Sequence, residues 1–170
     1  GDTGINDLRR IVDTGNYVAA ARRGTIAKKD INEDYVKHVL SFIDADKIKP
    51  FKLVIDAGNG MAGMLVPKVF KELRCKVIPM YFELDGTFPN HPASPIEPEN
   101  VEDLRAKVKE TGADLGAAFD GDADRMFLCD ENAVLLGGDM VTALVARNLA
   151  AKERGATILY NLICSKTVPK

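Results

Sequence analysis

Short apolar runs alternate along this chain with stretches in which apolar residues recur every three or four positions. The short runs are typical of buried strands, and the longer period is typical of one face of a helix. Helices are predicted at residues 30–44, 61–74, 98–112 and 137–155, and strands at residues 51–56, 75–84, 113–119, 125–130 and 156–163. Strands that alternate with helices in this order indicate an α/β layered domain.

Two prolines modify this prediction. Pro79 cannot donate a backbone hydrogen bond, so its strand fits an edge of the sheet better than the centre. Pro67 weakens the helix in which it stands. The segment before residue 30 gives no clear prediction.

The sequence GAAFDGDADRMFLCDE, residues 116–131, places three aspartates at alternate positions between two apolar runs. Asp120, Asp122 and Asp124 would project to one side of an extended chain, and a turn at Gly121 can bring them closer together. Carboxylates held that close repel one another unless a cation lies among them. Because the flanking strands fix both ends of the loop, we favour a divalent metal site over three solvated charges on a hairpin tip.

The spacing is close to that of an EF-hand calcium loop, in which Glu131 would take the twelfth position. Two features disagree with that motif, because Arg125 stands where it needs glycine and the flanks are strands instead of helices. What remains is an open site for a hard cation such as Mg²⁺, with an arginine whose planar fork suits phosphate oxygens. One divalent ion and one guanidinium balance the three carboxylates, which leaves room for a bound phosphate.

A rival hypothesis concerns the glycines after the first predicted strand. Gly58, Gly60 and Gly63 spell G-x-G-x-x-G, and Glu83 ends the next strand, where a dinucleotide-binding module has a ribose-binding acid. Such glycines often serve the backbone alone, and this hypothesis leaves the three aspartates unexplained. A phosphatase with a D-x-D-x-[TV] motif fits poorly, because the fifth residue here is Asp124.

Composition and charge restrict the class of protein. The 170 residues carry 23 basic and 25 acidic side chains and no basic stripe that could follow a nucleic-acid backbone. No apolar run approaches the ~18 residues that a membrane span needs. Cys75, Cys129 and Cys164 lack metal-site spacing and lie in or beside apolar segments, which favours buried reduced thiols and a cytoplasmic protein. We therefore expect neither a nucleic acid nor a membrane as partner.

Three motifs together resemble the second domain of the α-D-phosphohexomutases, the family of phosphomannomutase and phosphoglucomutase. They are DAGNGMAG, DGTFPNHPASPIEPEN and DGDADR, and the likeness also includes GDTGINDL near the start. The resemblance implies a three-layer α/β/α sandwich with a mixed, mostly parallel sheet. It also implies that residues 1–134 form the second domain and residues 135–170 begin the third, so that the chain is a piece of a longer enzyme.

The resemblance further implies phosphoryl transfer between the 1- and 6-positions of a hexose phosphate, through an enzyme phosphoserine and a bisphosphorylated sugar. In the family three aspartates hold Mg²⁺, which here are Asp120, Asp122 and Asp124. The fourth ligand is a phosphoserine oxygen, and Arg125 would contact the same phosphoryl group as the catalytic residue of this piece. The serine and the sugar-reading loops belong to the remaining domains, so we expect no catalysis from this piece alone.

Two positions depart from the family pattern. Many relatives carry two histidines in the proline-rich loop, whereas here Pro92 follows His91, so we expect His91 to be a structural or surface residue. Relatives often place a basic residue just before the position of Cys164 to meet the substrate phosphate, but this chain has Ile163. Lys166 is the candidate for that substrate-binding role.

Overall fold

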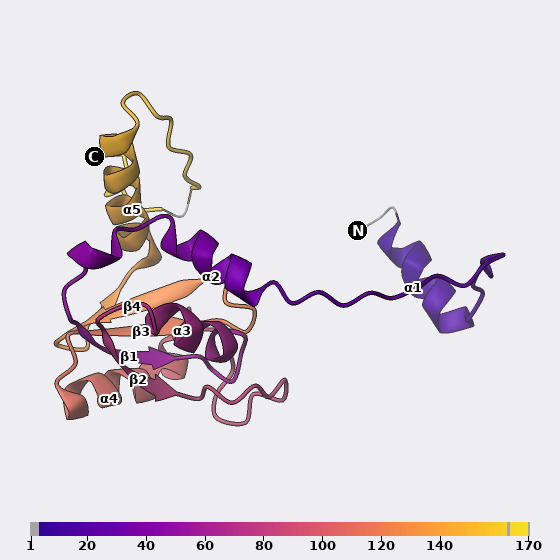
Figure 1. The fold of residues 1–170 in the computed structure, drawn as a ribbon, viewed down its shortest axis with the longest axis horizontal. Helices are drawn as coiled ribbons and strands as arrows, with labels where there is room; N and C mark the ends of the chain where they lie inside the picture. Colours follow the sequence, from indigo (N-terminus) through magenta and orange to yellow (C-terminus); the bar gives the residue numbers. More distant parts are fainter. Residues whose placement is uncertain (1–3, 163, 170) are drawn as a thin grey trace. The chain divides into compact units, whose positions relative to one another are not determined.

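The computed structural model describes residues 4–162 and 164–169, which belong to two compact units that divide after Ile31. The first unit contains one helix, α1 (Ile5–Thr14), which ends at Gly15 in the left-handed conformation (Figure 1). The sequence pattern did not predict this helix. The chain from Asn16 to Ile31 is irregular.

The second unit is built on a five-stranded sheet with the order β2-β1-β3-β4-β5. Its strands are β1 (Lys52–Asp56), β2 (Lys76–Met80), β3 (Leu115–Phe119), β4 (Met126–Asp130) and β5 (Leu135–Leu136). β1 pairs in parallel with β2 and with β3, whereas β4 is antiparallel to both of its neighbours. The sheet is therefore mixed and mostly parallel, as expected, and only β4 runs against the direction of the other strands.

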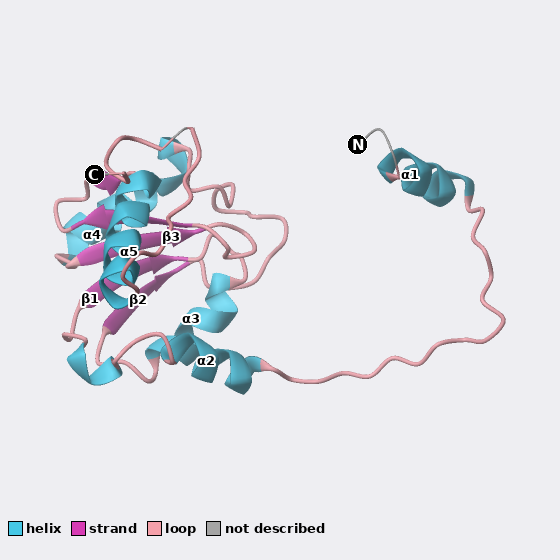
Figure 2. Ribbon diagram, turned by 90° about the horizontal axis from the view of Figure 1, so that it is seen from above, coloured by secondary structure: helices cyan, strands magenta, loops and turns pink. Residues whose placement is uncertain are grey.

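Helices cover both faces of this sheet, which gives the expected three-layer α/β/α sandwich (Figures 1 and 2). The helices are α2 (Asn32–Leu40), α3 (Ala62–Phe70), α4 (Glu102–Thr111) and α5 (Gly138–Lys152), with short 3₁₀ turns at Ala45–Lys47 and Pro98–Val101. Successive residues of β1 point to opposite faces. Val54 packs with Leu104 of α4, whereas Ile55 packs with Val66 of α3.

Several predicted boundaries are revised. Strand β2 stops at Met80 because Tyr81 has φ 53°, which is incompatible with an extended strand. Its place at the edge of the sheet confirms the prediction made from Pro79. The strand predicted at residues 156–163 is wrong for residues 156–162, which are irregular and have no neighbouring strand in the described chain; Ile163 lies outside the described residues.

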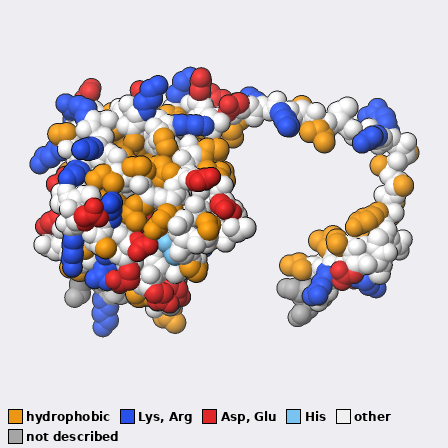
Figure 3. Space-filling view, turned by 90° about the horizontal axis from the view of Figure 1, so that it is seen from below, with side chains coloured by type: hydrophobic (Ala, Val, Ile, Leu, Met, Phe, Trp, Pro, Cys, Tyr) orange, Lys and Arg blue, Asp and Glu red, His pale blue; other side chains and the backbone are white. Residues whose placement is uncertain are grey.

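The surface mixes charged and apolar side chains. On the face shown in Figure 3, acidic and basic side chains are both spread around a central group of apolar side chains, without a continuous basic stripe. Among residues 4–162 and 164–169, none of the helices combines the length and hydropathy that a bilayer span requires. The three cysteines are free; Cys129 is buried, and Cys75 and Cys164 are half-buried.

Candidate metal centre

The aspartate loop, residues 120–125, connects β3 to β4 as a tight hairpin. Phe119 and Met126 are paired across the two strands, so the loop begins and ends at fixed points. Within it the amide of Asp120 donates to the carbonyl of Arg125 (3.2 Å), and the amide of Ala123 donates to the carbonyl of Asp120 (3.1 Å). These bonds hold the loop in one conformation, with Ala123 in the left-handed region at φ 63°.

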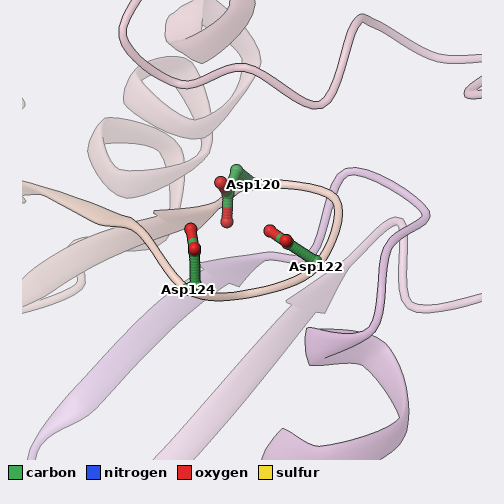
Figure 4. A group of neighbouring side chains, drawn as sticks. All are labelled: Asp120, Asp122 and Asp124. Atoms are coloured by element: carbon green, nitrogen blue, oxygen red, sulfur yellow. The ribbon is translucent and has the colours of Figure 1, made fainter. Parts of the chain in front are cut away.

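Three carboxylates converge inside this loop (Figure 4). One oxygen from each of Asp120, Asp122 and Asp124 lies within 4.8 Å of the other two. Asp120 is 1% exposed, and the other two are exposed to solvent. Ligand oxygens around Mg²⁺ are about 3 to 4.2 Å apart, given bonds of about 2.1 Å, so a small inward movement would bring all three onto one ion. A donor set of hard oxygens alone fits Mg²⁺.

Arg125 offsets part of this negative charge in the structure. Its Nε donates to Asp120 Oδ2 (2.6 Å) and to Asp124 Oδ1 (3.3 Å), and its backbone amide donates to Asp120 Oδ1 (3.1 Å). Burial acts to raise the pKa of Asp120, but the amide and guanidinium of Arg125 outweigh it, so this pKa is lowered. The same contacts raise the pKa of Arg125. Its side chain is 62% exposed, and the terminal guanidinium nitrogens make no hydrogen bond within the described chain.

The glycine turn, residues 57–60, is filled by the protein itself. A Cβ on Gly60 would lie 2.6 Å from the carbonyl oxygen of Gly121, and a Cβ on Gly63 would collide with the carbonyl oxygen of Phe82. The backbone of neighbouring loops therefore packs directly against these glycines, and the Gly58 amide already donates to Asp56 Oδ1. The structure gives no support to the dinucleotide-binding hypothesis.

Two buried polar residues beside the candidate site were not singled out by sequence reasoning. Asp56, at the end of β1, is fully buried; its Oδ1 accepts a hydrogen bond from the Gly58 amide (2.8 Å), and its Oδ2 lies 3.0 Å from His91 Nε2. Burial raises the pKa of Asp56, and the Gly58 amide and His91 offset part of that effect. Asn59 binds the loop after β2 through both its backbone and its side chain. An aspartate that closes an apolar strand and enters a glycine turn was the available signal.

Lys166, the candidate for substrate binding, is exposed on a turn after α5. Within the described chain it makes no hydrogen bond or ion pair with the aspartate loop, so the structure does not bring it together with Arg125. The position of Ile163, where a basic residue was expected, lies outside the described residues.

Comparison with known proteins gives a consistent result. Residues 33–137 match the family model described as phosphoglucomutase/phosphomannomutase, alpha/beta/alpha domain II. The chain is 41% identical over 144 residues to the phosphomannomutase/phosphoglucomutase of Pseudomonas putida, an alignment that covers 85% of this chain and 31% of that protein. It is 37% identical over 166 residues to the phosphomannomutase of Vibrio cholerae, covering 95% of this chain and 36% of the relative.

A solved structure shows the same fold. A phosphoglucomutase/phosphomannomutase family protein from Burkholderia thailandensis superimposes with a TM-score of 0.85 at 34% identity. The match covers 99% of this chain and 37% of that protein. The chain thus spans about a third of the length of the relatives that it matches.

Proposed function

The chain belongs to the phosphoglucomutase/phosphomannomutase family, and from that premise we propose that it supplies the metal-binding part of a phosphohexomutase. Residues 1–134 would form the second domain of that enzyme, and residues 135–170 would begin the third. The enzyme would interconvert hexose 1-phosphate and hexose 6-phosphate in the cytoplasm, with mannose, glucose or both as the sugar. Relatives named for both sugars support this substrate class.

One observation carries the proposal, namely the convergence of three carboxylates beside an exposed guanidinium at the end of a buried strand. Phosphoryl transfer needs little covalent chemistry from a protein; it needs positioning and stabilisation of the charge on the moving group. A Mg²⁺ ion held by Asp120, Asp122 and Asp124 would polarise a phosphoryl oxygen and neutralise its charge. The cluster has the charge and the donor atoms for that task.

The residues of the loop would have different roles in metal and phosphate binding, according to their burial. Asp120 is fixed by the amide and side chain of Arg125, so it provides a rigid position. Asp122 and Asp124 are exposed and can turn toward a ligand, Asp124 by giving up its 3.3 Å hydrogen bond from Arg125 Nε. The fork of Arg125 matches the spacing of two phosphate oxygens, so it would orient the phosphoryl group and stabilise its negative charge. Lys166 would bind the substrate phosphate.

The rest of the reaction would fall to the remaining domains of the same chain. The serines present are Ser41, Ser94 and Ser165, and none stands in the T-A-S-H-N-P type of loop that carries the phosphoserine in the family. A phosphoserine and a bisphosphorylated sugar would therefore involve parts of the enzyme outside this chain. The purified 170-residue chain should show no mutase turnover, and measurable turnover would contradict this division of roles.

The metal site can be tested with Mn²⁺, which broadens NMR signals near its binding site. Low concentrations of Mn²⁺ should broaden the amide signals around Asp122 first. Asp122→Asn should weaken Mn²⁺ binding about 10- to 100-fold and, in the intact enzyme, lower turnover by orders of magnitude while the fold is retained. The matched control is Glu131→Gln, which removes the acid that an EF-hand would use and should leave Mn²⁺ affinity unchanged. Equal affinity in wild type and Asp122→Asn would refute the site.

A further inference from the structure

The proline-rich segment, residues 85–97, packs against both the glycine turn and the aspartate loop. A Cβ on Gly58 would lie 3.4 Å from His91 Cε1, and a Cβ on Gly121 would lie 3.3 Å from Phe88 Cζ. These distances place Phe88 directly beside Gly121 in the loop that carries the three aspartates, with less than ordinary van der Waals space for a methyl group between them. Any movement of the segment would therefore change the space around Gly121.

The segment is fastened to the sheet by a buried pair. His91 Nε2 lies 3.0 Å from Asp56 Oδ2, with side chains that are 14% and 1% exposed. His91 Nδ1 lies 2.9 Å from the carbonyl oxygen of Pro92, which can only accept, so Nδ1 carries a hydrogen and donates it. One proton then lies between Nε2 and the carboxyl group, and the pair as a whole is neutral on either assignment.

The glycine turn transmits this attachment to the aspartate loop. Asp56 accepts a hydrogen bond from the Gly58 amide, and directly after the turn the Met61 amide donates to the carbonyl of Gly121 (2.9 Å). Gly121 stands between two of the converging aspartates. The turn is also bound to the segment, because Asn90 Nδ2 donates to the side-chain oxygen of Asn59 (2.8 Å). Contacts thus run continuously from the buried pair to the candidate metal ligands.

We propose that His91 is a positioning residue for the metal site: its bond to Asp56 holds residues 85–97 against Gly121 and thereby keeps the aspartate loop in its converged form. His91 itself binds no metal and touches no substrate in this role. The consequence for metal affinity rests on the proposed function, whereas the attachment itself can be measured without metal.

The experiment compares three variants of the 170-residue chain. His91→Ala removes the bond to Asp56, and His91→Gln keeps an amide N–H that can still donate to it. His38→Ala is the control, because His38 is the other histidine and is exposed on α2. Hydrogen exchange of the Met61 amide measures the attachment without metal, exchange of the Val108 amide in α4 measures global stability, and Mn²⁺ titration measures the site.

His91→Ala should accelerate exchange of the Met61 amide by at least about tenfold relative to that of Val108, and should weaken Mn²⁺ binding about tenfold. His91→Gln should restore most of both values, and His38→Ala should change neither. Equal acceleration at Met61 and Val108, or none, would overturn the proposal, because His91 would then serve only general stability. If the wild type bound no Mn²⁺ while Met61 still responded to His91→Ala, the proposed metal function would fail and the positioning of the loop would stand.

Discussion

Two loops leave the carboxyl ends of the neighbouring parallel strands β1 and β3, and each begins with a buried aspartate. Asp56 is 0% exposed and Asp120 is 1% exposed, yet the pKa of Asp56 is raised and that of Asp120 is lowered. The difference lies in the depth of burial and in the partners: desolvation dominates at Asp56, whereas at Asp120 the hydrogen bonds and the charge of Arg125 outweigh it. Asp56 faces a histidine inside a loop filled by the protein's own backbone, whereas Asp120 faces an exposed arginine and two further carboxylates. Burial of an acid therefore does not by itself identify a ligand site; its partners and the space around it do.

The largest expected effect tests whether the glycine turn after β1 is packed too tightly to admit a ligand. Gly60→Ala places a Cβ against the carbonyl of Gly121, which belongs to backbone that cannot easily move. We expect a loss of about 3 kcal/mol in the free energy of unfolding, measured by urea denaturation. Gly86→Ala is the matched control, because a Cβ at Gly86 meets no atom within 4 Å. Equal stability of the two variants would mean that the glycine turn has room for a ligand, and the contrast between the loops would be lost.

A smaller effect tests the opposite pKa shifts of the two buried acids. A lowered pKa stabilises the fold above the unfolded pKa of about 4, and that stability is lost as the pH falls through the folded value. A raised pKa acts in reverse, because its stability is complete below about pH 4 and is lost as the pH rises through the folded value. The destabilisation by Asp120→Asn should therefore grow with rising pH, and that by Asp56→Asn should shrink.

The measurement is urea unfolding of both variants and the wild type across the acid range without metal. Asn preserves the size of each side chain, so the slope of the destabilisation against pH reports the loss of the charge. Two slopes of the same sign would show that both acids respond to burial alone, contrary to the partners seen in the structure.

The smallest expected effect concerns Tyr81, which lies beside His91, the partner of Asp56. Its hydroxyl donates to Asp103 (2.7 Å) and its ring lies 5.3 Å from that of His91. The hydrogen bond to Asp103, with burial, raises the pKa of Tyr81 to about 12. This bond stabilises the fold below about pH 10 and is lost as the pH rises through 12, so its contribution at neutral pH is at most about 1 kcal/mol.

Alkaline absorbance titration can resolve this group among the four tyrosines. Tyr81→Phe should remove the last ionisation, and Asp103→Asn should shift it toward the ordinary value of about 10. Tyr17→Phe, which changes an exposed tyrosine, is the control. A wild-type titration in which all tyrosines ionise together would contradict the hydrogen bond.

The aspartate loop could be predicted because its parts are adjacent in sequence. The three acids, the arginine and the two flanking strands all fall within residues 115–130, so the local pattern was enough to expect convergence. Repulsion among the acids was then the reason to expect a cation. The pair of Asp56 and His91 could not be found in this way. These residues are 35 positions apart, and only the folding of the proline-rich segment over β1 brings them together.

Element prediction failed for a related reason. The apolar run at residues 156–162 has the composition of a strand, but a strand also needs a neighbour, and the pattern of one segment does not report on its partners. Conversely, β5 has two residues, too few to show any period. Helix α1 was detectable, since Ile5, Leu8 and Val12 have helical spacing. The domain boundary near residue 134 stays a prediction.

The position of Pro79 on the outer strand β2 also affects whether strands of other molecules can pair with this sheet. The main chains of Lys76 and Met80 bond toward β1, so alternation directs the amide positions of Val77 and Pro79 away from the sheet. Proline has no hydrogen to offer there, which leaves the free edge without one of its few donors. A strand from another molecule would find an incomplete template at this edge, and the domain is thereby protected against edge-to-edge aggregation.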